Sequence, residues 1–346
     1  MMSVYEIFVF LFLLFAVLLN KRATRASSWI FYLSVFALIA VAALRGLDVG
    51  TDTIHYYDHF HHMRDTDDRG ENLYYAIVDF FGSYANYDAF MWFIYSLIVG
   101  GVAYVIYYSS NDRFFSLFLF VTLGFYTQSL NIMRQYMVVS IAFIAIYYLS
   151  RNLSKKGLFW FVITILISAL IHHTALLAFL YIPILYLKIK NLWWYGAMAG
   201  SFIIGIIFSS YLTYIFEPFY ALLDDYYIGY LEMADIDASR NMISNAALNL
   251  VGLSTLYFAP KESEKKWTVH FLVLSVILNN IFGWGYLVRV SICFGVAQLI
   301  AIPIVTKSIR NIFVRYLYIA FIILYCFVRF YVVTLHSDGI MPYVLR

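Results

Sequence analysis

The 346-residue chain is poor in charge and in proline. Only 12% of its residues are charged and five are prolines, whereas 63% are hydrophobic, and the mean hydropathy is +0.79. A soluble globular chain averages about 45–50% apolar residues, so this chain lacks the charges needed to cover a water-exposed surface. A formal net charge of only +3 is also too small to indicate a nucleic-acid partner. We therefore expect an integral membrane protein that binds no nucleic acid.

Two further features are scarce. Cys293 and Cys326 are the only cysteines, and both lie in apolar runs, which indicates small core residues rather than a disulfide. Alternation of apolar and polar residues is missing from runs such as FVFLFLLFAVLL at 8–19, which argues against a transmembrane β-barrel. The expected fold class is thus all-α, a polytopic helical bundle forming a single transmembrane domain over 1–346.

The apolar runs recur along the whole chain, and a helix needs roughly 20 residues to cross a bilayer. We expect about twelve transmembrane helices. Their expected ranges are 3–20, 28–44, 88–108, 114–130, 134–150, 158–172, 174–188, 193–212, 241–260, 267–284, 288–306 and 313–333.

The basic residues predict the orientation, because cytoplasmic loops are enriched in Lys and Arg. The first apolar run precedes its basic residues, so it is not a cleavable signal peptide and its amino terminus is predicted to lie outside. Alternate connections then contain every lysine and 15 of the 23 basic residues: Lys21, Arg22, Arg25, Arg113, Arg151, Lys155, Lys156, Lys188, Lys190, Lys261, Lys265, Lys266, Lys307, Arg310 and Arg315. These connections hold few acids, which supports a cytoplasmic location.

Two long connections fall on the predicted outer side, facing the periplasm or the cell exterior. The first runs from about 45 to 87, and its segment 71–83 is predicted to be a helix lying in the membrane interface, too short and polar to span. The second runs from about 213 to 240 and is rich in tyrosine and acids, including Asp224 and Asp225. Aromatic rings suit the headgroup level.

Three arginines lie at the outer edges of apolar helices: Arg45, Arg134 and Arg289. A cation at that depth is costly and usually faces a cavity or a partner, although an extended side chain can also reach the headgroups. Guanidinium groups bind phosphate oxygens with two parallel hydrogen bonds. We therefore expect these arginines to bind a lipid-linked phosphate or pyrophosphate, with Arg329 as a further contributor or a structural partner of an acid.

Candidate general bases lie at the same level. His172 and His173 form an outer corner between two helices, where a histidine can accept a proton near neutral pH; a purely structural corner histidine is the alternative. Asp52, in the VGTDT segment, is a second candidate base or a partner of Arg45. Asp52, His55, His59 and His62 would share one helix face, so a metal site is an alternative interpretation, but we expect none.

Several motifs resemble those of the EpsG family. They are LRGLDVGTDTIHYYDHF (44–60), GENLYYAIVDFFGS (70–83), SLNIMRQYMVVSIAFIAIYYLSR (129–151), LIHHTALL (170–177), VRVSI (288–292) and MPY (341–343). The resemblance covers nearly the whole chain in order, and it adds Thr51, Tyr56 and Gln135 to the candidate substrate-binding residues. The duplicated histidine is a departure from the pattern, and the spacing to Ala175 and Leu176 favours His173.

The resemblance implies a Wzy-type polymerase of O antigen, capsule or exopolysaccharide in the bacterial inner (cytoplasmic) membrane. Such an enzyme transfers a growing glycan from polyprenyl pyrophosphate to a new lipid-linked repeat unit, on the outer face. The implied roles are His173 or Asp52 as base, with Arg134, Arg289 and Arg45 stabilising the leaving pyrophosphate, and His172 contacting substrate. The resemblance also implies that the tyrosine-bearing outer loops bind sugar, with Asp224 and Asp225 bonding to its hydroxyls. No cofactor, metal or nucleotide sugar is expected. By analogy, the fold is expected to resemble glycosyltransferase C-type membrane enzymes.

Other membrane functions remain as alternatives. A lipid-linked oligosaccharide flippase or another transporter would place charges along a path through the membrane midplane, whereas the charges here stop at the rim. An O-antigen ligase is chemically nearest, and the order of motifs argues against it. The expected partners are the lipid-linked oligosaccharide, the bilayer, and a chain-length regulator and flippase as candidate protein partners.

Overall fold

Long apolar segments fold as helices in a membrane, because a helix satisfies its own backbone hydrogen bonds where water is absent. The computed structural model describes residues 2–19, 24–62, 71–187, 189–207, 242–260, 266–282, 288–337 and 339–346. Within these ranges the structure is helical, and only an isolated bridge between Arg45 and Leu345 has β character. The all-α class is thus confirmed.

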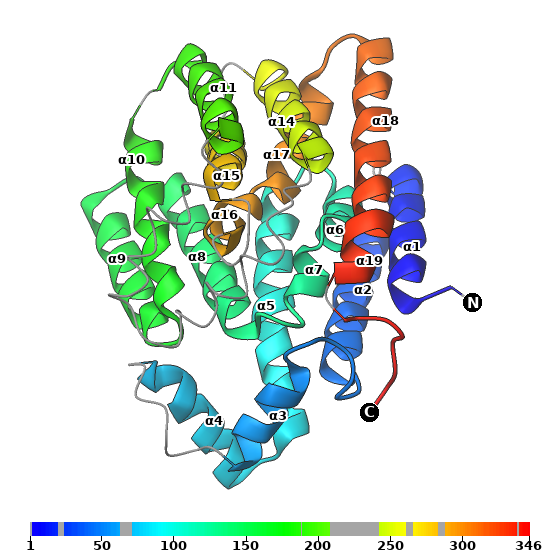
Figure 1. The fold of residues 1–346 in the computed structure, drawn as a ribbon, viewed down its shortest axis with the longest axis vertical. Helices are drawn as coiled ribbons and strands as arrows, with labels where there is room; N and C mark the ends of the chain where they lie inside the picture. Colours follow the sequence, from blue (N-terminus) through cyan, green and yellow to red (C-terminus); the bar gives the residue numbers. More distant parts are fainter. Residues whose placement is uncertain are drawn as a thin grey trace. The chain divides into compact units, whose positions relative to one another are not determined.

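The chain divides into two compact units, one formed by Met1–Leu180 with Ile302–Arg346 and the other by Tyr181–Ala301. The helices of the first unit are α1 (Val4–Leu19), α2 (Arg25–Ala43), α3 (Thr53–His62), α4 (Asn72–Tyr84), α5 (Tyr87–Ser109), α6 (Arg113–Thr122), α7 (Phe125–Gln128), α8 (Met133–Arg151), α9 (Lys155–Ala169), the 3₁₀ helix η1 (His173–Leu180), α18 (Ile312–Arg329), the π-helix η3 (Phe330–Thr334) and α19 (Leu335–Ser337) (Figure 1).

The helices of the second unit are α10 (Tyr181–Tyr186), α11 (Asn191–Ile207), α14 (Met242–Tyr257), α15 (Lys266–Phe282) and α16 (Val288–Gly295). Helix α17 (Gln298–Ser308) continues across the boundary in the chain. Buried amides join three helices of this unit: Asn280 on α15 donates to Asn249 on α14 and to Ser201 on α11, both at 2.9 Å. Polar side chains of this kind hold membrane helices together where no hydrophobic driving force acts between them.

Several helices of the first unit begin at residues that cap their amino ends. The side chains of these residues accept a hydrogen bond from the backbone N–H three positions later, which satisfies a donor that lacks a partner within the helix. The capping residues are Thr24, Asn86, Asp112 and Ser154. The sequence thus sets the start of α2, α5, α6 and α9 locally, at the membrane borders expected for them.

By length and composition, four of the described helices can cross a membrane: α2, α5, α8, and α18 with its continuation to Thr334. The bent pair Arg289–Gly295 and Gln298–Ser308, at 44°, makes a fifth if it is one span. The expected number of about twelve spans is not confirmed. The expected span 114–130 is divided into α6 and α7 at Gly124, whose φ of +86° is a left-handed conformation suited to glycine. Likewise, the expected span 174–188 is η1 followed by the short α10.

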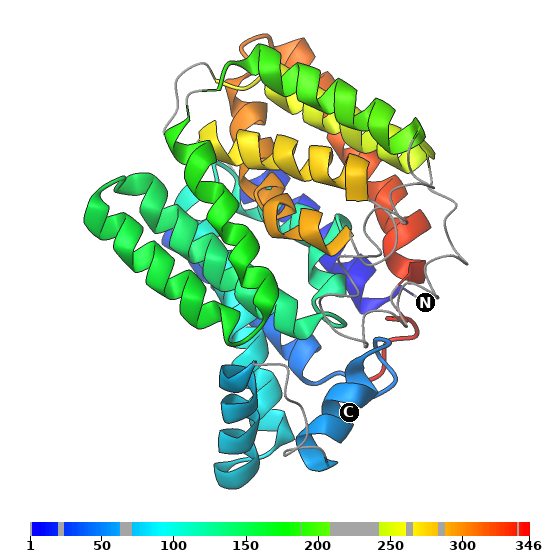
Figure 2. The same cartoon turned by 60° about the vertical axis from the view of Figure 1, so that its left-hand side comes forward.

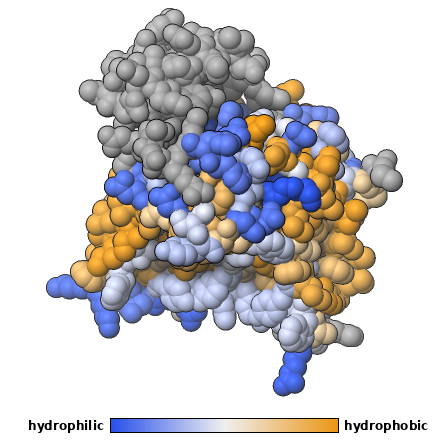
Figure 3. All heavy atoms as spheres, turned by 90° about the horizontal axis from the view of Figure 1, so that it is seen from below, coloured by the Kyte–Doolittle hydropathy of each residue, from blue (hydrophilic) through white to orange (hydrophobic). Residues whose placement is uncertain are grey.

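The segment after α2 carries two helices, α3 and α4, that lie beside the start of α5 at one end of the first unit, at the bottom of Figure 1. The expected interfacial helix 71–83 corresponds to α4, Asn72–Tyr84. Viewed from that end, hydrophilic residues cross the middle of the visible face and hydrophobic residues lie on its left and right sides (Figure 3). Helices α8 and α9 pack side by side, as Figures 1 and 2 both show, with the start of α8 and the end of α9 at this same end.

Candidate active site

Helix α4 is attached to the bundle through its amino end. The backbone N–H of Leu73 donates to the carbonyl of Leu170, just after α9, at 3.0 Å. This contact brings Glu71, the residue preceding α4, to the corner that contains His172. Glu71 is 3% exposed, and a carboxylate that deep requires charged or hydrogen-bonding partners.

Glu71 has two partners, one on each carboxylate oxygen. Arg134 Nη1, near the start of α8, lies 2.5 Å from Oε2, and His172 Nδ1 lies 2.5 Å from Oε1. The side chain of Glu71 is 5% exposed, whereas those of Arg134 and His172 are 21% and 17% exposed. Three residues from distant parts of the chain thus form one cluster, with the cation and the imidazole on its accessible side. We call Glu71, Arg134 and His172 the Glu71 cluster.

The electrostatics of the Glu71 cluster favour an ionised carboxylate. Burial raises the pKa of Glu71, but the hydrogen bond with His172 and the charge of Arg134 lower it by more, and the net pKa is below the ordinary glutamate value. A carboxylate bonded to Nδ1 fixes the imidazole as the tautomer with its proton on Nδ1. Nε2 of His172, for which the described residues offer no partner, can then accept a proton.

Aromatic residues of α3 and α4 lie on one side of the Glu71 cluster. The guanidinium carbon of Arg134 lies 5.2 Å from the centroid of the Tyr74 ring, a cation–π distance. Burial keeps the pKa of the Tyr74 hydroxyl well above its ordinary value, so the ring remains neutral. The ring centroids of His59 on α3 and Tyr75 on α4 lie 5.2 Å apart. Tyr56, also on α3, interacts electrostatically with Arg134. Helices α3 and α4 thus place aromatic side chains next to the cluster.

Arg45 has a different setting from the one expected for a ligand-binding residue, because it is completely buried. Its three nitrogens donate to Thr53 Oγ1 at 3.2 Å, to the carbonyl of Ala42 at 2.6 Å and to the carbonyl of Leu130 at 2.9 Å. Its guanidinium also lies 4.8 Å from the centroid of the Tyr95 ring. A lipid phosphate could reach this group only if the surrounding loop moved.

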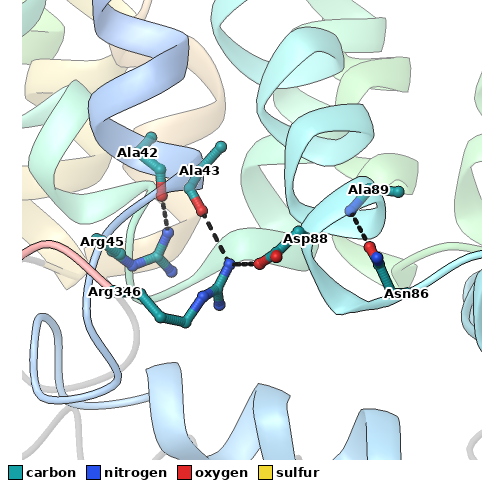
Figure 4. Close-up of polar contacts among 7 residues, drawn as sticks. All are labelled: Ala42, Ala43, Arg45, Asn86, Asp88, Ala89 and Arg346. Atoms are coloured by element: carbon teal, nitrogen blue, oxygen red, sulfur yellow. Dashed lines mark hydrogen bonds and ion pairs between the residues drawn. The ribbon is translucent and has the colours of Figure 1, made fainter.

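The same loop is fastened by the segment 339–346. Backbone hydrogen bonds join Gly46 to Val344 at 2.7 Å and Gly50 to Gly339 at 2.9 Å. Figure 4 shows the Arg346 guanidinium between the carbonyl of Ala43 and the carboxylate of Asp88, with which it forms an ion pair. Arg346 thus joins the end of α2 to the start of α5.

Gly50 allows the loop to approach Asn131, just before α8, closely. Its φ of +94° lies in the left-handed region, and a Cβ atom there would be 2.5 Å from Asn131 Oδ1. The following residues are more accessible: Thr51 is exposed and donates to Asp52 Oδ1 at 3.2 Å. Gln135, next to Arg134, is 2% exposed. Substrate binding by Thr51 and Gln135, and the role of Asp52 as a base, stay predictions.

The two corner histidines differ. His173 is exposed and close enough to Glu71 to lower the pKa of that carboxyl by its charge, but the hydrogen bond to Glu71 comes from His172. Arg329 donates to the carbonyl of Leu123 at 3.0 Å, a structural contact. Arg289 is the second residue of α16, in the second unit, and its role stays a prediction.

Within the described residues, no group of three or more His, Cys, Asp or Glu side chains is arranged to hold a metal ion. The tyrosine-rich segment 213–240, with Asp224 and Asp225, lies outside the described residues. A sugar-binding role for it therefore stays a prediction.

The prediction from sequence missed Glu71. The ENLYY segment was noted as part of a motif, but its acid was not assigned to the site. An acid at the start of an interfacial helix, at the same level as an arginine and a histidine, was the available signal. Only the fold brings these three positions together.

Comparison with known proteins agrees with the motifs. The model of the EpsG family matches residues 28–345, nearly the whole chain. No curated protein and no solved structure matches. Family membership in general implies a membrane polysaccharide polymerase. Apolar helices long enough to cross a membrane fit that assignment. The chain therefore belongs to the EpsG family.

Proposed function

We propose that the protein polymerises polyprenyl-pyrophosphate-linked oligosaccharide repeat units on the outer face of the cytoplasmic membrane. The observation that carries this proposal is the Glu71 cluster, in which a carboxylate joins a partly exposed arginine to a partly exposed histidine. A cation and an oriented base within one small site are what transfer of a sugar from pyrophosphate requires.

In the proposed reaction, a hydroxyl at the non-reducing end of the incoming repeat unit attacks the anomeric carbon of the growing glycan. The bond between that carbon and the pyrophosphate oxygen breaks, and polyprenyl pyrophosphate leaves. The hydroxyl proton passes to the base. The step thus needs one proton acceptor and one stabilised leaving group, and it needs neither a metal nor a nucleotide sugar.

Arg134 is the proposed ligand of the leaving pyrophosphate. Arg134 donates to Glu71 through Nη1. Its side chain remains partly exposed. The remaining N–H groups can donate to phosphate oxygens as negative charge develops on them. Glu71 and Tyr74 hold the guanidinium in place, so little reorganisation is needed when the lipid binds.

His172 is the proposed base, in place of His173. Glu71 orients its ring through Nδ1, which leaves Nε2 as the proton acceptor and stabilises the imidazolium that forms. His173, exposed at the same corner, is proposed to contact substrate. Asp52 stays a second candidate base.

The other predicted site residues receive supporting roles. Arg45 is proposed to act as a positioning residue, since its donors hold the loop that carries Thr51 and Asp52. Tyr56 with the neighbouring rings is proposed to contact sugar. Gln135 and Arg289 are proposed to bind the lipid-linked substrates, and a flippase and a chain-length regulator are proposed partners.

An O-antigen ligase is the second candidate, because it would use the same leaving group and the same kind of base. A flippase is less well supported, since moving a lipid across a membrane forms no bond and so needs no base oriented beside the phosphate ligand.

The test is a single substitution, Arg134→Gln, in a strain that depends on this protein for its surface polysaccharide. We expect loss of long glycan chains while single repeat units remain on display, because flipping and ligation continue. The matched control is Arg315→Gln, an arginine at the opposite membrane border that donates to the carbonyl of Ile309. Full-length polysaccharide from Arg134→Gln, at the protein level of the control, would contradict the proposal; loss of single units as well would favour a flippase or a ligase.

A further inference from the structure

A second polar site lies at the other end of the first unit. An open pocket of about 490 Å³ is lined by residues of α2, α5 and α6. The lining consists of Thr24, Arg25, Ser28, Trp29, Tyr32, Tyr107 and Arg113. None of these residues has a part in the proposed polymerase chemistry.

The pocket is separated from the Glu71 cluster by the length of the membrane helices. Ser28 at the start of α2 lies beside Tyr107 at the end of α5, with their hydroxyls 3.3 Å apart, whereas Arg346 joins the opposite ends of these helices. Helix α5 has 23 residues, and at 1.5 Å per residue it is roughly 34 Å long. The pocket therefore lies at the opposite membrane border, which the basic residues predict to be cytoplasmic.

Arg113 is held rigidly in the pocket. Its Nε donates to the carbonyl of Tyr107 at 3.1 Å, and its guanidinium carbon lies 3.7 Å from the centroid of the Tyr107 ring. Tyr32 stacks with the same ring, at 5.3 Å between centroids. The stacking and the Nε bond fix the plane of the guanidinium and leave its two terminal nitrogens as donors. A fixed fork of this kind suits a phosphate group.

The charge of the pocket is not compensated locally. Its lining includes two arginines and no acid, and among the described residues neither Arg25 nor Arg113 forms an ion pair with a carboxylate. The nearby Asp112 caps the start of α6 by accepting from the N–H of Phe115 at 3.0 Å. Ser28 and Thr24 add small hydroxyl groups, and Arg25 is exposed at the mouth. The complementary ligand is thus an anion with several oxygens.

The exposed rings beside the arginines indicate which class of molecule carries that anion. Trp29 is 68% exposed and Tyr32 is 49% exposed, on the same helix as Arg25. Trp and Tyr prefer the headgroup level of a bilayer, where their apolar bodies contact acyl chains. A soluble phosphate would gain nothing from these rings, whereas a phospholipid would fill both parts of the pocket.

We propose that this pocket binds the phosphate of an anionic phospholipid headgroup in the membrane leaflet on that side. Arg113 and Arg25 contact the phosphate oxygens, the hydroxyls of Ser28 and Thr24 contact the headgroup, and Trp29 and Tyr32 contact the acyl chains. The bound lipid anchors the start of α2 and the connection between α5 and α6 at the membrane border.

The experiment is native mass spectrometry of the full chain released from mixed micelles that contain phosphatidylglycerol or phosphatidylcholine. We expect one phosphatidylglycerol retained in preference to phosphatidylcholine. The double variant Arg25→Gln/Arg113→Gln should lose this preference, with affinity reduced about tenfold or more, as expected for lost charge-assisted hydrogen bonds. The single variant Arg25→Gln should fold normally, because the position is exposed. We expect it to weaken phosphatidylglycerol binding about threefold, which is roughly half of the free-energy change of the double variant.

The matched control is Arg315→Gln. Arg315, like Arg113, donates to the carbonyl six residues earlier in the chain, but it does not line the pocket. Unchanged lipid retention in Arg315→Gln, with reduced retention in Arg25→Gln and in the double variant, supports the proposal. Equal retention in all variants overturns it.

A further arm adds inorganic phosphate at millimolar concentration. If phosphate alone displaces phosphatidylglycerol completely, the pocket is a site for free phosphate, and the lipid assignment is overturned. If phosphatidylglycerol remains bound, the lipid assignment is supported.

Discussion

Glu71 binds Arg134 through one carboxylate oxygen and His172 through the other, each at 2.5 Å. This single side chain thus connects the start of α8 with the corner after α9 and fixes the amino end of α4 against both. The carboxylate neutralises part of the charge of Arg134 in the absence of substrate and orients the base. Substrate binding and proton transfer are coupled through it in the proposed mechanism.

The ionisation of Glu71 should make stability depend on pH. The pKa of Glu71 is lowered in the folded protein, so its contribution is fully present above the ordinary glutamate pKa of about 4.3 and is lost as the pH falls through the lower, folded value. We expect Glu71→Gln to be less stable than the wild type at pH 7, by about 1–3 kcal/mol. Unfolding midpoints in detergent, measured from pH 7 to pH 3, should show this difference shrinking in the acid range. A difference that grows on acidification would contradict the assignment.

The two corner histidines should behave differently. If His172 is the base, His172→Gln should reduce chain extension by about 10²–10⁴-fold, the usual contribution of general base catalysis. His173→Gln should reduce it far less, because that side chain is exposed and does not bond to Glu71. The glycan ladder of each variant, at matched protein levels, provides the measurement. The reverse order of effects would restore His173 as the base.

Replacing Arg45 should lower the stability of the folded protein. Its buried nitrogens donate to two carbonyls and one hydroxyl, and Arg45→Met leaves these acceptors without their partner. We expect a loss of about 2–4 kcal/mol of stability from the unpaired groups. Thermal unfolding in detergent measures it, with Arg315→Met as the control for a less buried arginine. Normal stability together with abolished polymerisation would instead indicate direct contact with substrate.

Gly50 and Gly100 form a matched pair of substitutions. An alanine at Gly50 would combine a φ of +94° with a Cβ only 2.5 Å from Asn131 Oδ1, whereas nothing lies within 4 Å of a Cβ at Gly100. We expect Gly50→Ala to destabilise the protein by more than about 1–2 kcal/mol and to loosen the segment 339–346. Gly100→Ala, inside α5, should be neutral or stabilising by up to about 1 kcal/mol. Unfolding midpoints and the rate of proteolysis near Gly339 compare the two, and equal effects would argue against the tight loop.

The helical class and the approximate positions of the helices follow from the sequence, because apolar runs and capping residues act locally. The bounds of α4 were predicted nearly to the residue, and its location in the membrane interface stays a prediction. Helix breaks were not predicted: Gly124 divides one expected span, and the corner after α9 continues as a 3₁₀ helix. Hydropathy averages over such local backbone changes, so it overestimates the continuity of spans.

The candidate site shows a similar division. Arg45 and Arg134 were equal candidates from sequence, because both lie at the outer edges of apolar helices. Only the fold reveals that Arg45 donates to buried carbonyls and Arg134 to Glu71. The choice between His172 and His173 also depended on a contact with a residue 101 positions away. Long-range pairing of this kind leaves no local signal.

The most direct test of the central claim is turnover by the purified protein with a synthetic polyprenyl-pyrophosphate-linked repeat unit. The wild type should release one polyprenyl pyrophosphate for each glycosidic bond formed. His172→Gln and Arg134→Gln should each release it at least about 100-fold more slowly, while His336→Gln, an exposed histidine elsewhere in the same unit, keeps the wild-type rate. Wild-type turnover in both His172→Gln and Arg134→Gln would contradict the account.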